Sequence, residues 1–245
     1  MSPRWPRSAV HASAVLAAWE RAAGTAGHER ALALLDPADA DPDRPLGARD
    51  ADLLVVLRDV RGPDLDALAT CPACGTTLEV HLPVDDLRAG YVGPGPAGAL
   101  AGGGALVTVA IGAVVVRVRP PATADLLAVS HLPTVAAARA ALLARCVLDV
   151  TPAGAVLTDD VVAEVGRRLE ESDPLVDVRV RVVCAECGHA WAALLDVPEL
   201  VWAQVSGVGR RLLREVDVLA RRYGWSEGDI LALSEERRRA YLDLP

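Results

Sequence analysis

Cys71-Pro72-Ala73-Cys74-Gly75 and Cys184-Ala185-Glu186-Cys187-Gly188 are the two stretches that decide how this chain folds, and we call them the first and second hook. Two residues between cysteines allow both thiolates of one tight turn to bind one metal ion, and the following glycine permits a left-handed backbone. A site with four protein ligands and no open position is normally structural. The sequence therefore predicts one structural zinc ion bound by Cys71, Cys74, Cys184 and Cys187.

Two other interpretations of the hooks stay open. A Cys-x-x-Cys pair is also typical of thiol–disulfide redox proteins, which place a strand before the pair and begin a helix at its first cysteine. Here a strand pattern follows the first hook, and a second hook exists. Alternatively, the four cysteines bind no metal and only the fold is retained.

Three further residues could in principle bind the metal or act as a nucleophile. His81 and His189 are near enough in sequence to replace a cysteine ligand, although an exposed or packing histidine is the simpler interpretation. Cys146 lies in an apolar helical run and is most simply a small buried side chain. A catalytic thiol at Cys146 would need a histidine–carboxylate partner, and none is recognisable.

The segments beside the hooks have the period of strands. Apolar and charged residues alternate from Val176 to Val183, which is typical of a half-buried strand. We expect an antiparallel ribbon, with the metal at its tip, that also contains 77–82 and 190–195. The second hook begins far beyond the usual spacing of an autonomous zinc ribbon. The inserted sequence predicts a hairpin of strands 106–111 and 113–118 around Gly112, then helices 135–147 and 159–171.

Helical patterns fill both ends of the chain. The first 35 residues are predicted to be helical with breaks at Gly24 and Gly27, a second helix opens at 47–50, and a short helical piece covers 64–69. From Glu199 to Tyr223 a narrow stripe recurs at helical spacing, suited either to the core or to docking. It consists of Trp202, Val205, Gly209, Leu212, Val216, Leu219 and Tyr223. Ser226 and Ser234 are predicted to cap two final helices.

These patterns predict an α+β fold. Helical N- and C-terminal regions, 1–70 and 199–245, would flank an antiparallel zinc-ribbon-like unit, 71–198, with a large α/β insertion between the hooks. The Gly/Pro-rich stretch 89–104 is predicted to be a flexible loop.

The composition excludes some chemistry. The chain has 245 residues, 52% of them apolar, so it can bury a substantial core. All 25 basic residues are arginine. Without lysine, phosphate-loop nucleotide hydrolysis and Schiff-base catalysis are excluded. The carboxylate pairs Asp85-Asp86 and Asp159-Asp160 are most simply solvated, so we expect no enzyme.

The charge and hydropathy bear on partners and location. A net charge of -8 argues against nucleic acid as the main partner, because phosphate binding needs a basic face. An arginine-lined strand face keeps that alternative open, formed by Arg117, Arg119, Arg179 and Arg181. No apolar run reaches the length of a membrane span and no cleavage site is convincing, so we expect a cytoplasmic protein without a signal peptide.

Several motifs together resemble one family, the T-even-phage-type baseplate hub assembly chaperones. The resemblance runs from about residue 12 to 244 and rests on the order of its pieces rather than on any one of them. The pieces are Gly47-Ala48-Arg49-Asp50, the first hook, 138–147, Glu171-Ser172-Asp173-Pro174, the second hook with His189-Ala190-Trp191, and 223–234. Two features depart from the family: Arg61 replaces an expected aromatic residue before Gly62, and the 89–104 loop is particular to this chain.

The resemblance implies a role in building contractile tails. The protein would be a transient chaperone or minor component of the baseplate hub in a phage tail or an extracellular contractile injection system. Its partners would be hub or spike proteins. The alternative is a zinc-ribbon adaptor that binds nucleic acid or protein and is unrelated to tails.

Overall fold

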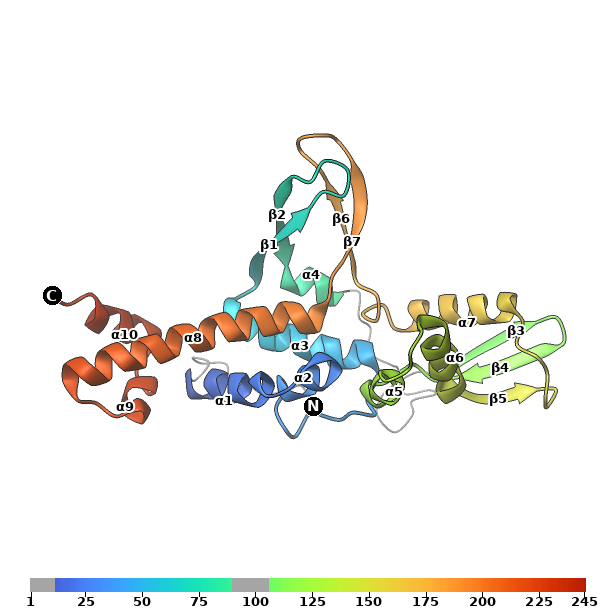
Figure 1. Ribbon diagram of the computed structural model, residues 1–245, viewed down its shortest axis with the longest axis horizontal. Coiled ribbons are helices and arrows are strands. Elements are labelled where there is room, and N and C mark those ends of the chain that lie inside the picture. Colours follow the sequence, from blue (N-terminus) through green and yellow to red (C-terminus); the bar gives the residue numbers. More distant parts are fainter. Residues whose placement is uncertain (1–11, 90–105) are drawn as a thin grey trace.

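The computed structural model describes residues 12–89 and 106–245. It is a mixed α+β structure in which a helical body carries a pair of projecting β-hairpins and, at one end, a separate unit of sheet and helices (Figure 1). Most of the predicted loop 89–104 lies outside the described residues, as do the first eleven residues of the predicted N-terminal helix. Ala89 itself ends helix α4 (Val84–Ala89).

The helical body is built around one long helix. Helix α8 (Val197–Tyr223) packs against α1 (Ala12–Ala23), α2 (Gly27–Ala33) and α3 (Leu46–Arg61). Helices α9 (Glu227–Leu231) and α10 (Glu235–Leu242) fold back on its C-terminal half (Figure 1). The N- and C-terminal regions therefore share one hydrophobic core, whose fully buried side chains include Leu34, Leu53, Leu54, Leu57 and Leu212.

The stripe on α8 forms part of that core. Val205 and Leu212 are buried in that core, and Trp202 and Val216 are partly buried against it. Leu219 is also buried. The helix begins where the Asp196 side chain accepts a hydrogen bond from the Glu199 N–H, and it ends at a left-handed Gly224. The predicted caps Ser226 and Ser234 are confirmed, since each accepts a hydrogen bond from the backbone three residues on.

Two hairpins project from the body. β1 (Asp64–Thr70) pairs with β2 (Thr77–Pro83), and β6 (Arg179–Val183) pairs with β7 (Ala190–Leu194), both antiparallel. The prediction of a helix over 64–69 is wrong. Its alanines favour a helix, but Leu65, Ala67 and Ala69 alternate with more exposed residues, and the pairing of Leu65 with Leu82 buries one face of a strand.

The insertion between the hooks folds around its own small core. β3 (Val107–Ile111), β4 (Val114–Val118) and β5 (Val147–Thr151) form an antiparallel sheet in that order. Val109, Val116 and Val118 pack against Val161 and Val165 of α7 (Asp159–Ser172). The predicted hairpin at Gly112 and the two predicted helices are confirmed, the first as α6 (Val135–Cys146). Helix α5 (Thr123–Val129) and strand β5 were not predicted.

Candidate metal centre

Both hooks occupy the loops at the tips of the hairpins, and their backbones are alike. In the first hook, Gly75 N–H donates to the Cys71 carbonyl and Cys71 N–H donates to Thr76, each at 2.9 Å. In the second, Gly188 N–H donates to Cys184 at 2.9 Å and Cys184 N–H donates to His189 at 2.8 Å. Gly75 and Gly188 have φ of 76° and 72°, the left-handed conformation that the sequence predicts.

The tips of the two hairpins lie side by side (Figure 1), and they bring all four cysteines together. Cys71 Sγ lies 3.7 Å from Cys187 Sγ, and Cys74 Sγ lies 3.6 Å from Cys184 Sγ, although 110 residues separate the latter pair. All four sulfur atoms lie within 4.8 Å of one another. A tetrahedral ion with bonds of about 2.3 Å to sulfur has sulfur–sulfur edges of about 3.8 Å. The four cysteines could therefore coordinate one metal ion.

The two cysteines of each hook differ in exposure. Cys71 and Cys184, the first of each pair, are buried, whereas Cys74 and Cys187 are exposed. Hydrogen bonds with the side chain and backbone of Thr76 lower the pKa of Cys74 to about 6. A thiolate is the form that binds a metal, so these hydrogen bonds favour the ligand form of Cys74.

The other candidate ligands lie apart from this group. His81 contacts the Asp66 carboxylate on β1 at 3.0 Å, and His189 stacks on Trp191. Cys146 is buried at the end of α6, as predicted, and burial raises its pKa to about 11. A protonated, buried thiol of this kind is unreactive.

The geometry also bears on the redox interpretation of the first hook. Strand β1 does precede Cys71, but a turn and strand β2 follow it in place of a helix. All five cysteines are free thiols, so neither hook is closed by a disulfide. The hooks match one another rather than a redox dithiol with a helix at its first cysteine.

The four arginines considered as a nucleic-acid-binding face lie on two different sheets. Arg117 belongs to β4 and Arg119 follows it, whereas Arg179 and Arg181 belong to β6. The Arg119 side chain is bound to Asp125. The structure therefore does not gather these arginines into one face.

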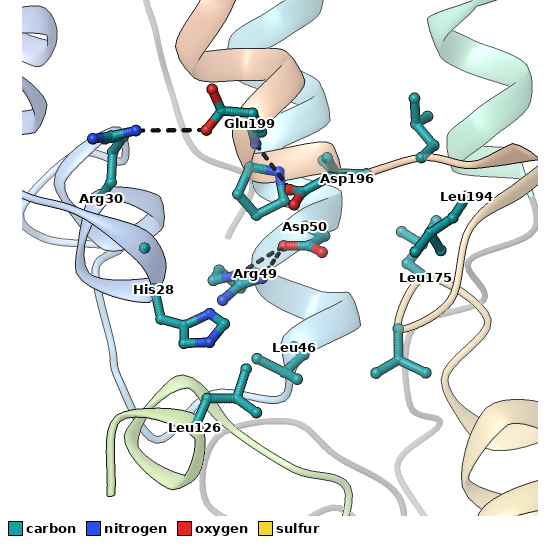
Figure 2. A pocket seen from close by; sticks show the side chains of 15 residues that line it. His28, Arg30, Leu46, Arg49, Asp50, Leu126, Leu175, Leu194, Asp196 and Glu199 are labelled. Carbon is teal, nitrogen blue, oxygen red and sulfur yellow. Dashed lines mark hydrogen bonds and ion pairs between the residues drawn. The ribbon is translucent and has the colours of Figure 1, made fainter. Parts of the chain in front are cut away.

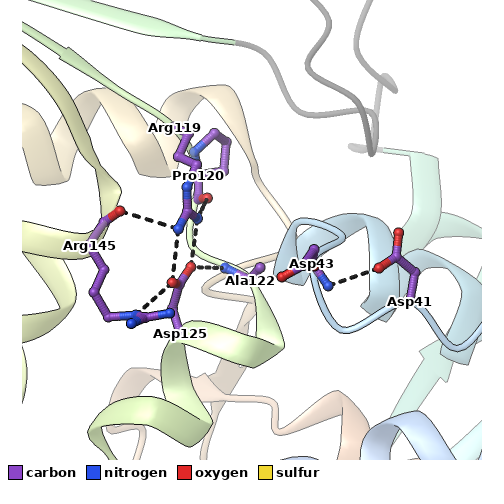
Figure 3. Close-up of polar contacts among 7 residues, drawn as sticks. All are labelled: Asp41, Asp43, Arg119, Pro120, Ala122, Asp125 and Arg145. Atoms are coloured by element: carbon purple, nitrogen blue, oxygen red, sulfur yellow. Dashed lines mark hydrogen bonds and ion pairs between the residues drawn. The ribbon is translucent and has the colours of Figure 1, made fainter.

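Sequence reasoning missed a network around Asp125, which has no solvent exposure (Figure 3). Its carboxylate accepts hydrogen bonds from Arg119 at 2.6 and 2.9 Å, from Arg145 at 2.9 Å and from Ala122 N–H at 3.0 Å. Burial alone would raise the pKa of Asp125, but these donors outweigh it and lower the pKa to about 2. The network joins α5 to the ends of β4 and α6.

A second missed contact joins two of the motifs that carry the family resemblance. Gly47 N–H, in the first turn of α3, donates to Asp173 Oδ2 at 3.0 Å, across 126 residues. Arg49 and Asp50 in the same turn form a buried ion pair at 2.7 Å. The Arg49–Asp50 pair is therefore a buried structural contact at the start of α3, and nothing in the local spacing of the sequence pointed to Asp173.

The paired carboxylates begin helices. Asp85 and Asp86 lie in the first turn of α4, and Asp159 and Asp160 lie in the first turn of α7, where negative charge is favourable. Asp85 also forms an ion pair with Arg58 at 2.8 Å.

No protein-family model, curated protein or solved structure matches this chain. None of the helices in residues 12–89 and 106–245 combines the length and the apolar character that a membrane span requires.

Proposed function

We propose that this chain is a non-enzymatic assembly chaperone, or a minor component, for the baseplate hub of a contractile phage tail or injection system. A single structural zinc ion, bound by Cys71, Cys74, Cys184 and Cys187 in a zinc-ribbon-like arrangement, would fix its fold. The protein would work in the cytoplasm, where thiols stay reduced. The proposal combines the family resemblance with the geometry of the described residues.

The observation that carries the proposal is where the resembling motifs lie. The two hooks meet at the hairpin tips, and the 47–50 and 171–174 motifs meet at the start of α3. Four of the six segments that carry the resemblance thus contact one another in pairs. This agreement supports treating the resemblance as one of the whole fold rather than of scattered pieces.

Zinc is the ion that best fits four thiolates in closed tetrahedral geometry. Its binding would tie the two hairpins together, and the binding energy of such sites, on the order of 10 kcal/mol, is coupled to folding. The arm so formed leaves apolar side chains exposed, Leu68 and Leu194 among them, as a protein-binding surface does. We infer that the arm and the helical body hold a hub subunit before the tail tube docks.

The zinc part is tested by replacing Cys184 with serine. We expect zinc content, measured by mass spectrometry of the native protein, and thermal stability to fall together. Cys146→Ala is the matched control: it removes a buried thiol outside the cluster and should leave zinc content unchanged. A Cys184→Ser protein that keeps full stability without metal would refute the coupling.

The assembly part is tested by affinity purification of the tagged protein from its own bacterium. Mass spectrometry would be applied both to the soluble pool and to sedimented sheathed particles. Hub or spike proteins in the soluble pool, with the bait missing from particles, would establish a transient chaperone, and bait in both fractions would indicate a component. Recovery of nucleic acid or metabolic enzymes without any tail protein would overturn the proposal.

A further inference from the structure

A cavity of about 280 Å³ lies where the N-terminal ends of α3 and α8 face α2, α5 and the end of β7 (Figure 2). It is separate from the cysteine cluster. Its walls combine charged side chains, Arg49 and Asp50 among them, with an apolar lining that includes Leu46, Leu126, Leu175 and Leu194. A cavity that combines apolar walls with charged groups at defined positions is typical of a site that binds a side chain or a small molecule.

The cationic groups of this cavity already have partners. Arg49 donates to Asp50 Oδ1 at 2.7 Å and to the Thr123 hydroxyl at 3.1 Å. Arg30 donates to the Thr25 carbonyl, lies 3.5 Å from Glu199 and covers the Trp202 ring. Burial, followed by the charge of Arg49, lowers the pKa of His28 and so favours its neutral form.

Unlike the cationic groups, the carboxylates in and near the cavity keep oxygen atoms that can still accept a hydrogen bond. Asp50 is only 6% exposed, and the Arg49 guanidinium contacts only the Oδ1 atom of Asp50. Within the described residues no donor contacts the other oxygen of Asp50, a residue that lines the cavity (Figure 2). Asp196 lines the same cavity, and the nearby Asp173 has a buried oxygen, Oδ1, that finds no hydrogen-bond partner in residues 12–89 and 106–245. Burial is the main cause that raises the pKa of Asp50, to about 6, and Asp173 and Asp196 raise it further.

A metal ion is not the best match for this surplus of negative charge. In the described part of the chain, the four cysteines are the only group of three or more ligand atoms close enough together to hold an ion. The cavity instead places one carboxylate oxygen at the end of apolar walls. An arginine side chain is complementary to such a cavity, because its aliphatic stem suits the apolar walls and its planar group of donors suits the carboxylate.

We propose that this cavity binds the guanidinium group of an arginine side chain presented by a partner protein, with Asp50 as the main acceptor. The leucines of the lining would contact the aliphatic stem. The inference deepens the proposed function, on which it rests for the identity of the partner as a subunit held during assembly. The chemistry of the cavity, however, can be tested without that subunit.

The experiment uses the full chain and two small probes, Nα-acetyl-arginine amide and its neutral analogue Nα-acetyl-citrulline amide. Amide chemical shifts in nuclear magnetic resonance would be followed at pH 7.5 as each probe is added. We expect saturable shifts from the arginine probe at the cavity and at least about tenfold weaker binding of the citrulline probe. Equal binding of both probes, or no saturable shift with arginine, would overturn the inference.

Two variants assign the binding to the cavity. Asp50→Asn keeps the shape of the side chain and should weaken binding of the arginine probe at least about tenfold. Leu194→Trp enlarges a side chain of the cavity lining at a position that is 66% exposed, and it should weaken binding of the arginine probe without disturbing the core. Val156→Trp is the matched control, at a position that is 79% exposed in the insertion between the hooks. This variant should bind the arginine probe like the wild type.

Unchanged binding in a folded Asp50→Asn protein would contradict the inference, and so would unchanged binding in Leu194→Trp if Asp50→Asn does not fold. The proposed function fails differently. If the probe does not bind but tail proteins still co-purify with the wild-type chain, only the cavity assignment is lost. If the probe binds and no tail protein co-purifies, only the assembly role is lost.

Discussion

Gly47 is a residue whose smallness the fold requires. A Cβ atom at this position would lie 1.7 Å from Asp173 Oδ1, because that carboxylate sits directly over the first turn of α3. The requirement comes from the approach of Asp173 and not from the backbone, since Gly47 is not among the residues with positive φ.

Gly47→Ala should therefore destabilise the protein by roughly 1–3 kcal/mol, the usual cost of overpacking a buried contact. Gly166→Ala in α7 is the control: nothing lies within 4 Å of its added Cβ, and alanine in a helix should stabilise by about 0.5–1 kcal/mol. Urea unfolding measures both. Equal effects of the two substitutions would contradict the predicted clash.

Asp125 gives a residue-scale prediction about pH. Because its pKa in the folded protein lies below the usual value of 3.8, its contribution to stability is present above about pH 4 and is lost as the pH falls to about 2. A shift of this size corresponds to roughly 2 kcal/mol. Asp125→Asn should be less stable than the wild type at pH 7, and the gap should narrow below pH 4.

Urea unfolding of both proteins at pH 7, 4 and 2.5 would measure that gap. Asp160→Asn, which changes an exposed carboxylate in the first turn of α7, is the control and should cost little at any of these pH values. A gap for Asp125→Asn that is constant across the range would show that the ionised form is not what Arg119 and Arg145 stabilise.

At the scale of elements, the contact between α1 and α8 depends on one small residue. An added Cβ at Gly209 would lie 2.9 Å from Cγ of Trp19, whereas one at Gly207, half a turn away on the same helix, would meet nothing within 4 Å. Gly209→Ala should destabilise by roughly 1–3 kcal/mol through overpacking. Gly207→Ala should stabilise by about 0.5–1 kcal/mol.

Thermal or urea unfolding of these two variants, made side by side, compares a packed and an open position with the same helix propensity. If both alanine substitutions stabilise the protein, α1 can move away from α8 at little energetic cost, and the stripe on α8 tolerates larger residues. If both destabilise, the effect belongs to the helix and not to Trp19.

The elements that the sequence predicts well are those whose signals are local. The hooks, the caps Ser226 and Ser234 and the stripe on α8 all depend on residues within a few positions of one another. Strand β1 was mistaken for a helix because its pairing with β2 outweighs the helix propensity of its alanines.

The polar contacts of the interior could not be predicted from the sequence, because they too join different segments of the chain. Asp125 collects donors from Arg119 and Arg145, and Asp173 reaches Gly47 across 126 residues. Such pairs form only once the chain has folded, and a single charged side chain in the sequence carries no sign of its partner. The cavity beside Asp50 is hidden in the same way, since five separate segments line it.

For the whole molecule, the division into two cores predicts uneven stability. The helical body and the hairpins share one hydrophobic cluster, while β3, β4 and α7 enclose another. Removing the proposed zinc ion with a chelator should raise hydrogen exchange in the hairpins, 64–83 and 179–195, and leave the sheet of 107–118 and 147–151 protected. Exchange that rises uniformly would mean that the two cores unfold as one unit.

The distance along the chain between Cys74 and Cys184, 110 residues, has a consequence for biosynthesis. A ribosome that adds roughly 5–20 residues per second needs about 5–20 s to travel from one hook to the other. During that interval the thiols of Cys71 and Cys74 have been synthesised without the second hook. They can neither complete the proposed four-thiolate site nor be covered by the second hairpin. Translation speed and the oxidant level of the host thus become determinants of how much protein matures.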